Sequence, residues 1–90
     1  MPNKQTKTAR KKREVTTPGG FPVHKIDLRV GANIKHFRQL AGMTQRELSK
    51  SVGVRFQQIE KYESAKNRVA ASRLWTISEA LDIDIGEFFK

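Results

Sequence analysis

The stretch from residue 44 to residue 62 constrains the fold most, because it predicts two short helices joined by a tight turn. Thr44-Gln45-Arg46-Glu47 is a capping box, in which the threonine hydroxyl and the glutamate side chain each bond the other residue's backbone amide. Gly53 ends this helix after about two turns, since glycine accepts a left-handed conformation at no steric cost. The apolar positions of the two helices are Leu48, Val52, Val54, Ile59 and Tyr62. The pattern is typical of a helix–turn–helix over about residues 44–64, whose two helices cross near ~90–120°.

Helical periodicity continues on both sides of this motif and predicts an all-α domain over residues 27–90. In a first helix, one apolar stripe is expected, with Asp27 as the N-cap and Gly42 just past the last turn. The residues of that stripe are Val30, Ile34, Phe37 and Ala41. A third helix is predicted over residues 55–64, a fourth over 71–81, and a short fifth between Asp84 and Glu87. Because prolines are absent after Pro22, nothing interrupts this compact five-helix unit.

Positive charge is concentrated near the N-terminus. The chain has 90 residues and a formal net charge of +9, and residues 1–26 hold seven basic side chains against one acidic side chain. This segment also has few large apolar residues, so it cannot bury enough surface to offset its ordering entropy. It is therefore predicted to be a flexible basic arm, with a solubilising tail as the alternative. The charge indicates a polyanionic partner, nucleic acid first and an anionic membrane surface second.

Composition narrows the class of protein further. The chain has no cysteine and two histidines, which argues against disulfide scaffolds and thiolate or His-rich metal sites, so no metal and no cofactor are expected. The apolar runs are too short for a transmembrane helix, and no apolar segment follows the basic N-terminus as in a secretory signal. A cytoplasmic protein is therefore expected. No nucleophile–base pair or phosphate-binding loop is visible, so an enzyme is not expected.

The order and spacing of these signals resemble the Cro/repressor-type helix–turn–helix family, which includes lambdoid phage repressors, Cro proteins and many small bacterial regulators. The matching residues are Gly31, Ile34, Arg38, Gly42, Thr44-Gln45-Arg46-Glu47-Leu48, Gly53-Val54, Ile59, Tyr62-Glu63, Leu74, Ile77, Ala80-Leu81 and Phe88. Four positions depart from the family pattern. Arg55 and Ala70 stand where the family tends to have capping Ser or Thr, Phe56 replaces a polar residue that is commonly Gln, and Ser49 replaces Ala.

The resemblance implies a sequence-specific DNA-binding transcriptional regulator, such as a bacterial or phage repressor, that acts as a homodimer on a palindromic operator. Its third helix would enter the major groove, which is about 12 Å wide. The residues expected to contact bases are Arg55, Phe56, Gln57 and Lys61. Those expected to contact phosphates are Gln45, Arg46, Lys66, Asn67 and Arg68. In the arm, Lys11, Lys12 and Arg13 would add nonspecific affinity or enter the minor groove.

Two further expectations concern contacts within and between copies of the chain. The fifth helix presents Ile85, Phe88 and Phe89 within five residues, more than so short a helix can turn into its own core. These three are therefore expected at a dimer contact, which the resemblance places in the same region. The resemblance also implies a partly buried ion pair between Arg38 and Glu63, the alternative being two solvated surface charges.

Three side chains of the predicted third helix each allow two interpretations. Phe56 either covers the rim of the core or contacts a thymine methyl group. Gln57 and Lys61 either read bases or form a hydrated helix surface. Outside this helix, Trp75 is expected to be half exposed, and both His24 and His36 are expected to be ordinary surface histidines.

A second function is also compatible with the sequence. The chain could be an antitoxin-like interaction module that binds a partner protein through its arm or its helical surface. Salt-dependent binding to one preferred DNA sequence would distinguish the regulator from this module.

Overall fold

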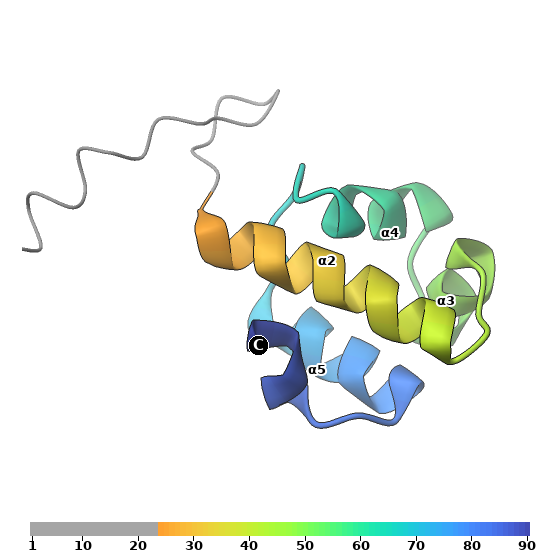
Figure 1. Cartoon of the computed structure of the whole chain (residues 1–90). Coiled ribbons are helices and arrows are strands. Elements are labelled where there is room, and N and C mark those ends of the chain that lie inside the picture. Colours follow the sequence, from red (N-terminus) through yellow and green to blue (C-terminus); the bar gives the residue numbers. More distant parts are fainter. Residues whose placement is uncertain (1–23) are drawn as a thin grey trace, which may run out of the picture.

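The computed structural model describes residues 24–90 of the chain (Figure 1). Over this range all regular secondary structure is helical and there is no β-strand, which confirms the predicted all-α class. The elements are α2 (Lys25–Leu40), α3 (Gln45–Val52), α4 (Phe56–Glu63), α5 (Ala71–Leu81) and the 3-10 helix η1 (Ile85–Phe89). Residues 1–23 of the predicted basic arm, which include Lys11, Lys12 and Arg13, lie outside the described residues.

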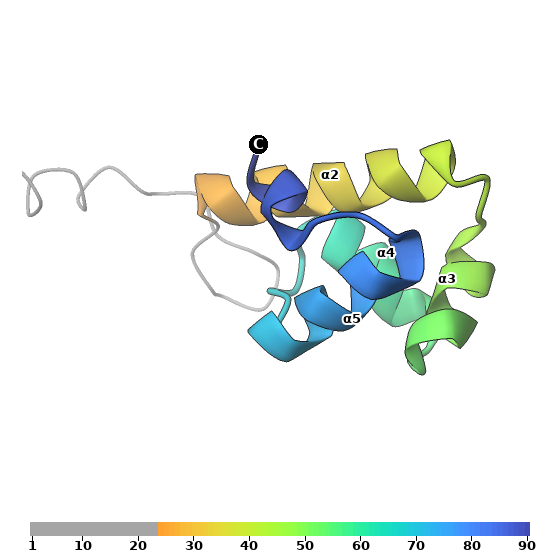
Figure 2. The same ribbon diagram turned by 90° about the horizontal axis from the view of Figure 1, so that it is seen from below.

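The long helix α2 organises the domain. It packs against α4, α5 and η1, while α3 packs against α4 and α5. Figure 2 shows α2 along one side of the molecule, with α4 and α5 beneath it and α3 at its C-terminal end. None of the described helices is both long enough and apolar enough to span a lipid bilayer.

The start of α2 differs from the prediction. The helix begins at Lys25, and its N-cap is His24, whose Nδ1 accepts a hydrogen bond from the Ile26 amide at 2.9 Å. The prediction that Asp27 caps the helix is therefore wrong, whereas His24 is exposed on the surface, as predicted, and also serves as the cap. Asp27 lies in the first turn, where a carboxylate interacts favourably with the exposed amides of the helix start.

The predicted fifth helix is a single 3-10 turn, so the described region has four α-helices where five were expected. It begins where the sequence indicates, because Asp84 Oδ1 accepts from the Gly86 amide at 3.1 Å. A bond from the Glu87 amide to the Asp84 carbonyl, at 2.9 Å, closes the tight turn. A segment this short gains few hydrogen bonds, which favours 3-10 over α geometry.

The core lies where α2, α3, α4, α5 and η1 meet. Its largest fully buried side chains are Phe88, Ile34, Leu48, Ile59 and Ile77. The rings of Phe88 and Phe37 meet edge to face, with centroids 6.3 Å apart. Phe88 has no exposed surface, so it has none to offer a second copy, and its predicted role at a dimer contact is wrong. Ala41, expected in the inward stripe, is exposed, whereas Trp75 is half exposed as predicted.

The turns that frame the helix–turn–helix follow the local sequence signals. The capping box is complete, with Glu47 N–H to Thr44 Oγ1 at 3.0 Å and Thr44 N–H to Glu47 Oε1 at 2.8 Å. Gly53 ends α3 at φ +76°, and Gly42 turns the chain after α2 at φ +73°. Ser49 is buried at the crossing, and its hydroxyl donates to the Arg46 carbonyl at 2.7 Å.

Candidate nucleic-acid interface

Helix α4 has one buried face and one exposed face. Ile59 and Tyr62 are buried and hold the helix on the core, whereas Gln57 and Lys61, one turn apart, are exposed. Arg55, which stands where the family tends to have a capping Ser or Thr, is the N-cap residue of α4; its side chain is exposed and makes no capping bond. The outer face of α4 therefore carries polar and basic groups on a helix that is fixed from behind.

A buried ion pair fixes the C-terminal end of α4. Arg38 Nε lies 2.6 Å from Glu63 Oε2, and the two side chains are 9% and 3% exposed, which confirms the pair. Arg38 also donates from Nη2 to Glu63 Oε1 at 3.1 Å and from Nη1 to the Met43 carbonyl at 2.8 Å. One guanidinium thus ties α2 to α4 and to the loop before α3, so the position of α4 is set by two other segments.

Gln45 joins the same network from the first turn of α3. Its amide nitrogen donates to Glu63 Oε1 at 3.0 Å, and the residue is half-buried. Gln45 is therefore oriented toward the ion pair, which sequence reasoning missed because the contact joins two helices. Its predicted contact with a phosphate stays a prediction.

Arg46 and Phe56 are stacked where α3 and α4 begin. The Arg46 guanidinium carbon lies 4.0 Å from the centroid of the Phe56 ring, and Phe56 is half-buried. A guanidinium over an aromatic face is held by the ring quadrupole. The stack lies beside a shallow hollow that is also lined by Lys50 and Arg55. Three basic side chains and one acidic one, Glu47, therefore line the hollow beside Phe56 at this end of α4.

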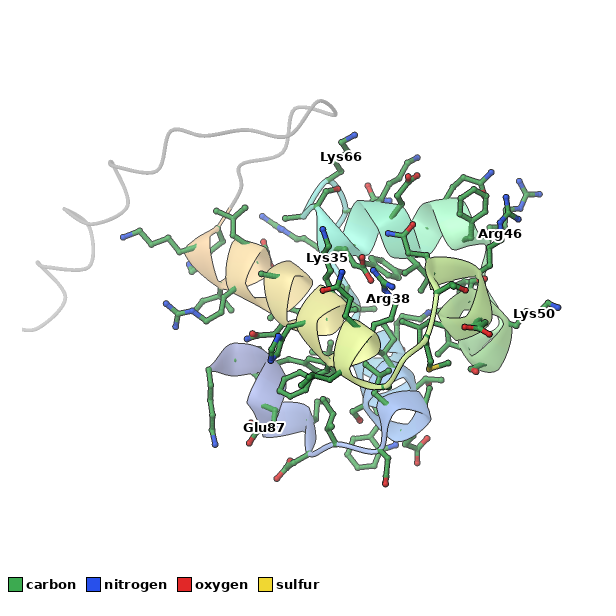
Figure 3. All side chains as sticks on the ribbon, turned by 45° about the vertical axis from the view of Figure 1, so that its right-hand side comes forward. Lys35, Arg38, Arg46, Lys50, Lys66 and Glu87 are labelled. Carbon is green, nitrogen blue, oxygen red and sulfur yellow. The ribbon has the colours of Figure 1, made fainter. Side chains whose placement is uncertain are left out.

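Lys50 is a basic residue of this surface that the sequence analysis did not single out. It follows Arg46 by four positions, so both side chains lie on one face of α3. Figure 3 shows both projecting from the α3 end of the molecule, with Lys66 beyond the other end of α4. The i, i+4 spacing of the two basic residues was the signal that could have identified Lys50.

The loop after α4 turns sharply. Ala65 is buried and has φ +62°, and the Lys66 amide donates to the Lys61 carbonyl at 2.9 Å. Lys66 and Asn67 are exposed on this turn. Arg68 is also exposed, and its Nε forms an ion pair with Asp27 Oδ2 at 3.2 Å. Three of the five residues predicted to contact phosphates thus lie together after the C-terminal end of α4, with Arg68 held toward α2.

The described surface around α4 is suited to binding an anion. Exposed lysine and arginine side chains stand at both ends of α4: Arg55 at its N-cap, Lys61 in its last turn and Lys66 just beyond it. No group of three His, Cys, Asp or Glu side chains between residues 24 and 90 is arranged to hold a metal ion.

Comparison with known proteins identifies this arrangement of helices. A family model described as helix-turn-helix matches residues 34–88, more than half of the chain. The chain belongs to the helix-turn-helix family. The predicted resemblance to its Cro/repressor-type members is confirmed.

One relative within this helix-turn-helix family is an uncharacterized HTH-type transcriptional regulator of Sinorhizobium medicae. It is 48% identical over 65 residues, which cover 72% of this chain and 47% of that protein. The chain therefore spans about half the length of this curated relative.

Two solved structures share the fold of the helix-turn-helix domain. The restriction-modification controller protein C.AhdI from Aeromonas hydrophila has a TM-score of 0.67 at 22% identity, over 69% of this chain and 94% of that one. The master regulator for biofilm formation SinR, solved in complex with DNA, has a TM-score of 0.63 at 22% identity, over 68% and 98%.

Proposed function

We propose that this chain is a sequence-specific, DNA-binding transcriptional regulator that acts as a homodimer with α4 in the major groove. The observation that carries the proposal is the two-sided α4, with Gln57 and Lys61 exposed and the opposite face anchored in the core. A rigidly held helix with polar donors on its outer face fits a groove about 12 Å wide. The named function of the curated relative and the DNA-bound state of SinR support it.

The contacts divide by position along α4. Gln57 presents an amide that can bond adenine N6 and N7, and Lys61 an ammonium that can bond guanine O6 and N7. Phe56, held by Arg46, offers apolar surface to a thymine methyl group. Lys66 and Asn67 at one end, and Arg46 and Lys50 at the other, would bond phosphates on either side of the groove. Arg55 could contact either bases or phosphates. Gln45, which donates to Glu63, would contact the DNA backbone.

Selection of binding sites from a random DNA pool tests this function directly. We expect a palindromic sequence to be enriched, with half-sites about 10 base pairs apart on one face of the duplex. Binding to that sequence should weaken steeply as salt rises. Enrichment of no sequence would contradict the proposal, and tight binding to a protein partner without DNA preference would favour the interaction module instead.

Two lysine variants distinguish base reading from phosphate binding. Lys61→Ala should cost about 1–3 kcal/mol on the selected site and relax the preference at one position in each half-site. Lys66→Ala should weaken binding to the selected site and to random DNA by the same factor, since phosphates carry no base identity. Competition binding with both DNAs measures the contrast. If Lys61→Ala also weakens both equally, Lys61 is a phosphate contact and base reading falls to Arg55, Phe56 and Gln57.

Dimerisation is proposed through the surface around η1. Phe89 is 45% exposed and Ile26 is 37% exposed, and both line a hollow with Val69 between α2 and the start of α5. Ile85 is half-buried on the same turn. Apolar side chains clustered this way mark an interaction surface.

Phe89→Glu should give a folded monomer. We expect its affinity for the palindromic site to fall at least about tenfold, since each 1.4 kcal/mol of lost contact is a factor of ten. Sedimentation and operator binding measure the two effects. Leu40→Glu is the matched control, because Leu40 is 69% exposed at the other end of α2. This variant should leave the oligomeric state and the operator affinity unchanged. An unmodified protein that stays monomeric on DNA and at high concentration would contradict the dimer.

A further inference from the structure

A groove with an exposed tryptophan lies on α5 and the turn that follows it. The groove is lined by Trp75, Ser78, Glu79, Asp82, Ile83, Asp84 and Ile85. Trp75 is 54% exposed. An indole contributes most to stability when its ring is buried and its N–H donates a hydrogen bond, so this exposure is unusual. The proposed DNA contacts use none of these residues. In Figure 1 the turn after α5 lies at the bottom of the molecule and α4 at the top.

The groove is acidic in a basic chain. Between residues 74 and 89 the sequence has four carboxylates and no lysine or arginine, whereas the whole chain has a net charge of +9. Glu79 and Asp82 are exposed, and within residues 24–90 neither side chain makes a hydrogen bond or an ion pair. Asp84 uses one carboxylate oxygen to bond the Gly86 amide. Two unpaired carboxylates thus flank an exposed indole, a combination that binds a cation by charge and by its ring face.

We propose that this groove binds the basic segment of the same chain, residues 4–13, when DNA is absent. That segment holds Lys4, Lys7, Arg10, Lys11, Lys12 and Arg13. One of these cations would lie over the Trp75 ring, and others would pair with Glu79 and Asp82. The same six charges would otherwise face the basic side of the domain, which carries Arg46, Lys50 and Lys61 and repels them.

The chain is long enough for this contact. Ten residues separate Arg13 from His24, and an extended chain of that length spans about 36 Å. Helix α2, from whose start the segment leaves, is only ~24 Å long at ~1.5 Å per residue. The extended linker is therefore longer than α2, and charge complementarity selects the acidic groove. DNA phosphates carry the same sign as the groove, so they would compete for the same six cations.

Trp75 is the only tryptophan of the chain, so its fluorescence reports on the groove directly. The experiment compares acrylamide quenching of Trp75 in the full chain with that of a full-length variant whose six basic residues between positions 4 and 13 are replaced by Gln. Without DNA and at low salt, we expect quenching to be roughly twofold stronger in the variant, because a cation over the indole shields the ring face. At about 1 M salt, where the Debye length is ~3 Å, the unmodified chain should reach the value of the variant.

The acidic side of the contact is tested in the same way. Glu79→Gln with Asp82→Asn should remove the protection of Trp75, whereas Glu60→Gln, an exposed carboxylate on α4, should leave it in place. Equal quenching of the unmodified chain and the Gln variant at low salt would overturn the proposal. So would protection that survives the loss of Glu79 and Asp82. Protection that grows with protein concentration would overturn binding within one chain and assign the groove to the segment of a second copy. Because no DNA is present, none of these outcomes depends on the proposed DNA contacts.

Discussion

Replacing Arg38 by methionine is expected to lower the free energy of unfolding by about 3–5 kcal/mol, the cost of leaving a buried charge without its partner. The Glu63 carboxylate is 3% exposed and receives two of its three side-chain hydrogen bonds from Arg38. Methionine keeps much of the volume but donates no hydrogen bond. The Glu63 carboxylate would then be left with Gln45 alone, and the Met43 carbonyl would lose its bond from Arg38.

Urea unfolding of the full chain measures this loss, with two matched variants. Arg29→Met removes the same charge from an exposed position on the same helix and should change stability by less than about 0.5 kcal/mol. Arg38→Met combined with Glu63→Leu should regain most of the loss, since well-packed apolar residues replace a buried pair at little net cost. A loss of less than about 1 kcal/mol in the single variant would mean that water solvates the Glu63 carboxylate, as at an exposed pair.

The turns and most helix bounds could be predicted because their signals are local. The capping box at Thr44 and the glycines at positions 42 and 53 act within one turn of chain, and all appear as predicted. Helix α5 covers Ala71–Leu81, the range that its apolar periodicity predicts. Each of these features depends only on residues within a few positions of it, so no knowledge of the tertiary arrangement is needed.

Two predictions failed where the local signal was weak. Aspartate is a common N-cap and histidine is not, so the sequence favours Asp27, although an imidazole nitrogen can also accept from a backbone amide. In η1, three apolar residues lie within five positions, and a segment so short has no periodicity that tells which one is buried. Phe88 is buried because the turn after Asp84 directs it toward Phe37, and that is a property of the packed domain.

The candidate site was predicted in outline and not in its contacts. The exposed face of α4 follows from periodicity, because Ile59 and Tyr62 must point inward. The contacts that orient its neighbours cross between helices: Gln45 with Glu63, and Arg46 with Phe56. Sequence spacing within one helix carries no information on which side chains of another helix lie opposite, so these pairs became visible only in the folded chain.

Gly31→Val is expected to destabilise the domain by about 3 kcal/mol or more, because α2 and α4 touch at this glycine through backbone atoms. A Cβ at Gly31 would lie 2.5 Å from the Tyr62 carbonyl oxygen and 2.8 Å from that of Glu63. Backbone cannot rotate away as a side chain can, so the end of α4 must move. Gly31→Ala should also destabilise, by about 1–3 kcal/mol, although alanine in a helix interior normally gains up to about 1 kcal/mol over glycine.

The matched control is Gly86→Ala. The nearest atom to a Cβ added at Gly86 is Asp84 Oδ1, at an ordinary contact distance of 3.8 Å. The urea unfolding midpoint of this variant should stay close to that of the unmodified chain. The displacement of α4 gives a second measurement. Gly31→Ala, if it remains folded, should bind the selected DNA site more weakly relative to random DNA, because base contacts require a fixed helix while phosphate contacts tolerate a shift. If Gly31→Ala instead raised stability, α2 and α4 would have room to separate at no cost, and Gly31 would not set their approach.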